Sequence, residues 1–364
     1  MVERGALFNR LPEELTERIL AYLPISTIFR CRCVCKHWNK LLTTNSFLES
    51  WGEFSPKDVW FLVYHTRRTV AAYSPRSGWW NNLPLFERCS LDSSQVLLLA
   101  SSGGFLCFRN RNSDYPTLIV CNPVTSTHRV LPEMPQIRYI DIVGMVADRV
   151  SGSYTILVTG TPEPTCNESI TEVYDSRTQR WEQHCRSQQE FLQFWYEVHA
   201  IWHDGFFYCL ATPLNTSQGY RLIAYDMEKR EWIDLNVKMP SGDLRCPSLL
   251  ICQGKLLLAG KIVEDYLIRS ICIWELDNLK WVKVVEMPDE VLKKIHSPHS
   301  VLIQCQGYGD LLCFSTHRGW QSIIYDLSKR TWNWLPENDV SKSQAMGRNN
   351  LVGLPYEPSL CARV

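Results

Sequence analysis

The stretch from Arg30 to Lys40, RCRCVCKHWNK, contains three cysteines and a histidine. Thiolate sulfur and imidazole nitrogen are the usual ligands of structural zinc, so a metal site is the first chemistry to consider. Zinc sites usually combine a CxxC knuckle with a second pair of ligands, whereas here the spacing is CxCxC and no second pair follows. We therefore expect no metal in this stretch, and the sequence predicts no cofactor elsewhere.

The same stretch has the pattern of a helix, which gives a second argument against a metal. Side chains two positions apart on a helix point about 200° apart, so Cys31, Cys33 and Cys35 could not converge on one ion. Cys31 and Cys35 would lie one turn apart, and we expect both to line a core.

The rest of the sequence offers little for catalysis. The motifs GxxxxGKS/T, HExxH and GxSxG are absent. His199 and His203 could face the same way on a strand, but two histidines without a third ligand predict a metal only weakly. We expect a protein without catalytic residues.

Composition excludes further classes of partner. The 364 residues include 38 basic and 38 acidic residues, so no net field attracts nucleic acid or an anionic membrane. No apolar run reaches the roughly 18 residues of a membrane helix, and the first ten residues have no apolar signal core. We expect a location in the cytoplasm, the nucleus or both.

Two helical segments are predicted in the first fifty residues. The segment from Leu11 to Pro24 has a proline near each end and two carboxylates in its first turn. Its aliphatic residues recur every four positions, which predicts an apolar face opposite Glu13, Glu17 and Arg18. A second helical segment is predicted from about Ser26 to Leu42.

These segments resemble the F-box, a motif of three helices. The resemblance is carried by Leu11-Pro12, by the spaced aliphatic residues and by the sequence VCKHW from Val34 to Trp38. It implies binding to the Skp adaptor of a cullin-RING ubiquitin ligase, although some of the matching residues must hold the three helices together. The implied adaptor-binding residues are Leu11, Pro12, Leu15, Ile19, Leu20, Leu23, Val34, Cys35 and Trp38. The alternative is a helical cap on the larger domain.

The remainder of the chain is a repeat. Three segments share an aromatic residue, an aspartate next to it and a tryptophan seven positions after it: Tyr174 to Trp181, Tyr225 to Trp232, and Tyr325 to Trp332. Looser copies begin at residues 73, 121 and 274, so the period is near 50, which is the kelch value. Each copy has room for four short antiparallel strands, which form one blade of a propeller.

Nearly the whole chain therefore resembles the plant F-box/kelch-repeat family. Single residues such as Gly160 and Gly260 stand where kelch repeats have a double glycine. The expected fold is mainly β: a six-bladed kelch-type β-propeller over residues 56–364, preceded by a small all-α F-box over residues 1–55. The first blade lacks its innermost strand, and we expect the apolar tail from Leu351 to Leu354 to supply it.

The resemblance implies a non-catalytic substrate-recognition subunit, in which the propeller binds an unidentified target protein. The alternative is a kelch-type enzyme or a cytoskeletal scaffold. Loops between strands two and three of a blade, and between blades, share one face and vary widely, so we expect the target there. The candidate target-binding residues are Arg111, Tyr115, Phe194, Trp195, Tyr196, Tyr266, Arg269, Arg318 and Trp320.

Overall fold

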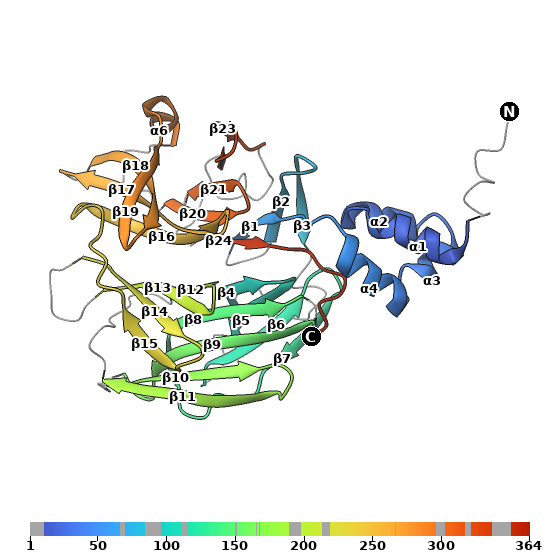
Figure 1. Cartoon of the computed structure of the whole chain (residues 1–364), viewed down its shortest axis with the longest axis horizontal. Helices are drawn as coiled ribbons and strands as arrows, with labels where there is room; N and C mark the ends of the chain where they lie inside the picture. The colour runs from blue at the N-terminus through green and yellow to red at the C-terminus, as the bar shows by residue number, and fades with distance from the viewer. Residues whose placement is uncertain are drawn as a thin grey trace.

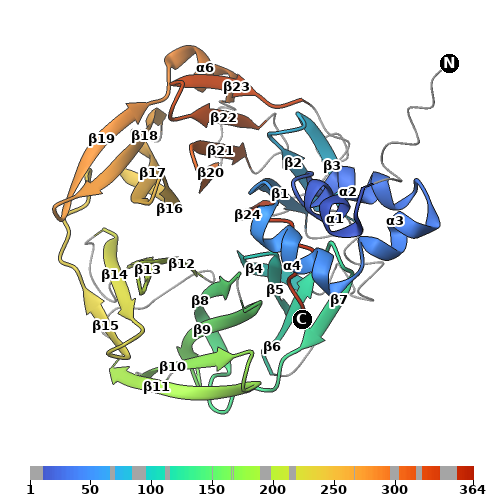
Figure 2. The same cartoon turned by 45° about the vertical axis from the view of Figure 1, so that its right-hand side comes forward.

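The computed structural model describes most of the chain. The described residues are 11–65, 70–83, 96–110, 115–149, 151–164, 166, 168–188, 198–212, 219–265, 267–295, 303–316, 322–336 and 351–364. Within them a group of helices lies against one side of a ring of β-sheets (Figures 1 and 2). No helix in these ranges is long and apolar enough to cross a membrane.

Four helices lie between residues 11 and 65, where the resemblance implied three. They are α1 (Glu13–Ala21), α2 (Ile25–Arg32), α3 (Lys36–Leu41) and α4 (Asn45–Phe54). Pro12 and Pro24 directly precede α1 and α2, in agreement with the fixed φ of proline, which suits a helix start.

The second predicted helix is broken at the cysteines. α2 ends at Arg32, and Cys35 has an extended backbone with φ −158° and ψ 164°. The Sγ of Cys35 accepts a hydrogen bond from the backbone N–H of Trp38 at 3.4 Å and so caps α3. Cys31 is buried but Cys35 is exposed, so our expectation that both line a core is wrong for Cys35. Cys31, Cys33 and Cys35 therefore do not lie on one continuous helix, and the 200° spacing does not apply to them.

The face that α1 buries differs from the predicted one. The buried residues are Thr16, Glu17, Leu20 and Ala21. Glu17 was expected in solvent, but its carboxylate accepts hydrogen bonds from Thr44 Oγ1 at 3.2 Å and Ser46 Oγ at 2.8 Å. These bonds tie α1 to the start of α4, while Leu15 and Ile19 of α1 remain exposed.

The β-sheets of the described ranges follow one another around a ring (Figure 2). One sheet has the order β24-β1-β2-β3, formed by Leu351–Tyr356, Trp60–His65, Val70–Ser74 and Trp79–Leu83. The next contains β4 (Val96–Ser102), β5 (Phe105–Asn110), β6 (Thr117–Asn122) and β7 (Thr127–Val130). The chain is therefore a β-propeller preceded by a helical region, as expected.

An eight-stranded sheet continues the ring, because β8 and β12 pair in parallel, with Val198 opposite Ile142. Its first half contains β8 (Tyr139–Asp148), β9 (Ser153–Thr161), β10 (Glu168–Asp175) and β11 (Arg180–Gln188). Its second half contains β12 (Val198–His203), β13 (Phe206–Ala211), β14 (Arg221–Asp226) and β15 (Glu231–Asp234).

Two further four-stranded sheets complete the ring. One contains β16 (Leu244–Cys252), β17 (Lys255–Glu264), β18 (Leu267–Asp277) and β19 (Lys280–Glu286), followed by helix α6 (Asp289–Ile295). The other contains β20 (Ile303–Tyr308), β21 (Leu311–Thr316), β22 (Ile323–Asp326) and β23 (Thr331–Trp334).

The ring is closed by strands from the two ends of the chain. β24 pairs antiparallel with β1, with Trp60 opposite Tyr356 and Leu62 opposite Leu354. This is the pairing predicted for Leu351 to Leu354, extended by two residues. The Trp80 Nε1–H also donates to the carbonyl oxygen of Pro336 at 2.7 Å, which ties β3 to the residues after β23.

The repeated motif forms the turn between the two outer strands of a sheet. In each of three copies the aromatic residue lies directly opposite the tryptophan: Tyr174 with Trp181, Tyr225 with Trp232, and Tyr325 with Trp332. The aspartate beside the aromatic residue accepts backbone N–H bonds within the turn, for example from Glu228 to Asp226 at 2.9 Å. The motif therefore forms a hairpin turn that is held by hydrogen bonds within the motif itself.

The helices and the repeated turns lie at the same end of the propeller. β24 ends and β1 begins there, and the hairpin turn at Gly104 contacts the residues that follow β24. We call this end the turn face. The β5–β6 and β17–β18 connections lie at the opposite end of their strands, which we call the loop face.

Candidate functional site

Exposed apolar side chains gather on the N-terminal helices. Leu15, Ile19 and Tyr22 of the α1 region are 48%, 44% and 55% exposed, and Val34 is 64% exposed. With Leu11 and Phe29, both more than a third exposed, they form what we call the apolar stripe. An exposed group of this kind is typical of a surface that binds another protein.

Contacts inside the helical group hold α1 in this orientation. Tyr22 packs against Phe54 with ring centroids 5.4 Å apart, and the Arg18 guanidinium lies 5.1 Å from the same ring. The Trp51 Nε1–H donates to the carbonyl oxygen of Leu23 at 3.3 Å. The part of the stripe that lies on α1 is therefore held on an anchored helix.

The predicted adaptor-binding residues divide into two groups. Leu11, Pro12, Leu15, Ile19, Val34 and Cys35 are exposed. Leu20 is only 2% exposed and belongs to the core, while Leu23 and Trp38 are partly buried against that core. These last three residues hold the helices together.

Sequence reasoning missed two members of the apolar stripe, Tyr22 and Phe29. Tyr22 lies seven residues after Leu15 and three after Ile19, so the helical period could have placed it on the same face. Phe29 lies within the second predicted helical segment but is not among the residues that carry the F-box resemblance.

The cysteines of α2 and α3 form no metal site in the ranges described. No group of three histidine, cysteine or acidic side chains there could hold an ion. The Cys33 Sγ donates instead to the carbonyl oxygen of Phe29 at 3.6 Å, and the Cys35 Sγ caps α3.

Two candidate target-binding residues are described, both at the loop face. Tyr115 precedes β6 and is 47% exposed, and the Arg138 guanidinium lies 4.7 Å from its ring. Arg269 is exposed on β18 and is within 3.4 Å of Glu264 and 3.8 Å of Asp265. The remaining candidates, Arg111, Phe194, Trp195, Tyr196, Tyr266, Arg318 and Trp320, lie outside the described residues.

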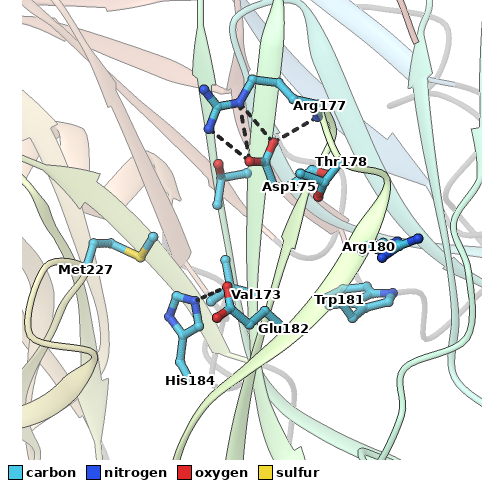
Figure 3. A pocket seen from close by; sticks show the side chains of 10 residues that line it. Val173, Asp175, Arg177, Thr178, Arg180, Trp181, Glu182, His184 and Met227 are labelled. Atoms are coloured by element: carbon cyan, nitrogen blue, oxygen red, sulfur yellow. Dashed lines mark hydrogen bonds and ion pairs between the residues drawn. The ribbon is translucent and has the colours of Figure 1, made fainter.

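A pocket of about 610 Å³ opens at the turn face beside β10 and β11 (Figure 3). Its lining includes Asp175 and Arg177, whose carboxylate and guanidinium lie 2.9 Å apart, and Glu182, which lies 2.8 Å from the Arg230 guanidinium. These acids are already paired with guanidinium groups, and Arg180 is a further charged residue of the lining.

His184 forms the inner wall of this pocket. Its Nδ1 is hydrogen-bonded to the Tyr225 hydroxyl at 3.0 Å, and burial lowers the pKa of its imidazole. A histidine with a lowered pKa is neutral at pH 7, so it does not attract anions. Because its acids are paired and its histidine is neutral, this pocket is a weaker candidate site than the apolar stripe.

Two known families match the chain. Residues 8–50 match the F-box domain and residues 72–333 match the KIB1-4 beta-propeller. The first match covers the helices that carry the apolar stripe, and the second covers most of the ring.

Several plant proteins are similar to the chain over nearly its whole length. "Protein UNUSUAL FLORAL ORGANS" of Arabidopsis thaliana is 23% identical, with 99% of this chain and 87% of that protein covered. "F-box only protein 6" of the same plant is 27% identical, with 98% and 75% covered. An F-box/kelch-repeat protein, also from Arabidopsis thaliana, is 24% identical, with 99% and 91% covered.

Solved structures with a similar chain path include TolB from Acinetobacter baumannii. It is 10% identical and has a TM-score of 0.47, with 82% of this chain and 66% of that chain covered.

Proposed function

This chain belongs to the family of F-box proteins whose F-box domain is followed by a KIB1-4 β-propeller, and we propose that it is the substrate-recognition subunit of a Skp-cullin-F-box ubiquitin ligase. The helices bind the Skp adaptor, and through it the cullin-RING ligase, while the propeller binds a target protein. The observation that carries this proposal is the apolar stripe, whose side chains remain in solvent on an otherwise packed group of helices.

The adaptor contacts are assigned to the exposed members of the predicted set. These are Leu11, Pro12, Leu15, Ile19, Val34 and Cys35, with Tyr22 and Phe29 added by their exposure. Burying one large apolar side chain stabilises a complex by roughly 1.5 to 3 kcal/mol, so a few anchors of this kind suffice for stable binding.

The target-binding surface is assigned to the loop face. The helices lie at the turn face, so an adaptor bound there leaves the opposite end of the ring free for a second protein. Tyr115 and Arg269 have the aromatic and guanidinium groups that are common in binding hot spots.

The fold proposed in detail is a six-bladed, kelch-type propeller. The eight-stranded sheet counts as two blades, β8–β11 and β12–β15, which together with the four other sheets gives six. The proposed domain boundaries are residues 1–55 and 56–364. The proposed location is the cytoplasm, the nucleus or both.

The chain contributes position and no covalent chemistry in this proposal. Holding a target beside a ubiquitin-charged enzyme raises the effective concentration of the reacting groups, and this alone accelerates the transfer. A kelch-type enzyme or a cytoskeletal scaffold is the alternative, but neither needs an apolar stripe on the helices.

Adaptor binding is tested by changing Leu15 and Ile19 to aspartate. Each change removes an apolar anchor and adds a charge that would have to be desolvated, so we expect the dissociation constant for purified Skp adaptor to rise at least about tenfold per residue. Calorimetry or a pull-down measures this binding.

Leu267→Asp is the matched control, because Leu267 is 49% exposed, like Leu15, but lies on β18 of the propeller. It should leave adaptor binding unchanged. Equal binding by the wild type and the Leu15/Ile19 double variant would overturn the assignment of the adaptor surface.

A further inference from the structure

The residues after β24, from Glu357 to Val364, lie between helix α4 and the propeller (Figures 1 and 2). We call them the C-terminal segment. Leu360 and Ala362 in this segment are 8% and 3% exposed, so the segment is packed although it has no regular secondary structure. It contacts both neighbours through polar and apolar groups.

On one side the segment contacts α4. The Cys361 Sγ donates to the carbonyl oxygen of Leu48 at 2.9 Å, and the Arg363 Nη2 donates to Asn45 Oδ1 at 2.6 Å. A Cβ atom at Gly52 would lie 3.3 Å from the Cys361 Sγ, so the helix and the segment are in close contact. Leu360 belongs to the same apolar core as Phe47 and Trp51 of α4.

On the other side the segment is held by Asn122, at the end of β6. Asn122 is fully buried, and its Nδ2 donates to the carbonyl oxygens of both Ser359 and Ala362, each at 2.8 Å. The hairpin turn at Gly104 packs directly against the segment, because a Cβ atom at Gly104 would lie 2.5 Å from the Ser359 Cβ. The Arg129 Nη2 reaches the carbonyl oxygen of Val364 at 3.4 Å.

Asn122 occupies the position at which three other copies of the repeat have an aspartate, namely Asp175, Asp226 and Asp326. Its Oδ1 performs the same local task as those acids, accepting the backbone N–H of Val124 at 3.0 Å. Only an amide can also donate two hydrogen bonds, and a carboxylate would face the two carbonyl oxygens with a negative charge. The copy of the repeat that donates hydrogen bonds to the C-terminal segment is therefore the one with asparagine in place of aspartate.

We propose that Asn122 is a positioning residue, which holds α4 in one orientation on the propeller by way of the C-terminal segment. The hydrogen bonds from Thr44 and Ser46 to Glu17 attach α1 to α4. A fixed α4 therefore keeps the apolar stripe in a fixed direction relative to the loop face. This consequence rests on the proposed function, in which one end binds the adaptor and the other binds the target. The positioning itself is a property of the chain alone.

Asn122→Asp separates the two roles of this side chain. The substitution keeps an oxygen for the Val124 N–H, as in the other repeats, but removes both hydrogen bonds to the segment. In hydrogen exchange measured by mass spectrometry, we expect the amides of α4 and of residues 357–364 to exchange roughly ten to thirty times faster, which is the loss of two hydrogen bonds. The amides of β16 to β19 should be unaffected.

Asn333→Asp is the control substitution, because Asn333 is exposed on β23 and its side chain donates to Thr331 within the same strand. It should change no exchange rate in α4. A chain ending at Tyr356 is the second variant: it keeps β24, lacks the segment, and should show the same faster exchange in α4.

Adding Asn122→Asp to the shortened chain should produce no further acceleration in α4, because the segment through which Asn122 acts is gone. Unchanged α4 exchange in full-length Asn122→Asp, or a further acceleration in the shortened chain, would overturn the proposal. Adaptor affinity is measured separately and should stay within about twofold, since the stripe does not include α4. Failure of the wild type to bind the adaptor would refute the proposed function and leave the exchange result intact.

Discussion

Asp141 is one of the acidic residues of the described part of the chain whose carboxylate is largely buried. It lies in β8 at an irregularity of the pairing with β9, between Ile140 and Ile142. Its Oδ2 is buried and has no hydrogen-bond partner among the described residues, and burial raises the pKa of the carboxyl to about 6. Because the pKa is raised in the folded state, the folded chain binds the proton more tightly, and stability falls as the pH rises from about 4 to 6.

Asp141→Asn should therefore stabilise the protein above pH 6, by about 1 to 3 kcal/mol, and have little effect near pH 4. Urea unfolding at pH 4 and pH 8 measures the difference. Asp243→Asn changes an exposed carboxylate and should shift stability by less than about 0.5 kcal/mol at either pH. A stabilisation of the same size at both pH values would exclude the proposed cause.

At the scale of the element, the repeated turn contains a strained position. Gln179, Arg230 and Arg330 occupy the same place in three turns and have φ of 57°, 61° and 55°, in the left-handed region. The copy that begins at Tyr73 has a glycine at this place, Gly78, with φ of 73°. A residue with a Cβ is disfavoured there, whereas glycine is not.

Gln179→Gly should raise the free energy of unfolding by about 0.5 to 1 kcal/mol, since relief of strain exceeds the added entropy of the unfolded chain. The Gln179 side chain is exposed, so removing it costs little packing. Chemical denaturation measures the free energy of unfolding. Gln179→Ala keeps a Cβ and should give no gain. A glycine variant less stable than the wild type would show that strain at this turn is small.

At the scale of the whole molecule, the ring depends on one strand from the end of the sequence. β24 covers the inner edge of β1. Gln304 Oε1 of β20 accepts a hydrogen bond from the backbone N–H of Gly353 at 3.0 Å, so β24 is also bound to the neighbouring sheet. An uncovered β1 would expose unpaired backbone groups and part of the inner core.

Deleting residues 350–364 should therefore lower the melting temperature by more than 10 °C, on the order of several kcal/mol, and promote aggregation. Differential scanning calorimetry and light scattering measure the two effects. The chain that ends at Tyr356 is the control, because it retains β24 and should lose much less stability. Equal melting of the wild type and the longer deletion would contradict closure by β24.

Much of this molecule follows from short-range sequence pattern. The aromatic residue and the tryptophan of each repeat are seven positions apart and meet across one turn, so the repeat alone predicts the outer hairpins. Pro12 likewise predicts the start of the first helix and Pro24 its end, and the absence of a β1 partner before Trp60 predicts the pairing of the tail.

Contacts between distant parts of the chain determine which side chains are buried and which remain exposed. Glu17 is buried because Thr44 and Ser46 satisfy its carboxylate, a contact that the helical pattern of α1 does not contain. The break between α2 and α3 depends on a cysteine cap that competes with continuing the helix. Asn122 meets Ser359 and Ala362 more than two hundred residues later in the chain, and contacts between such distant residues leave no periodic trace in either segment.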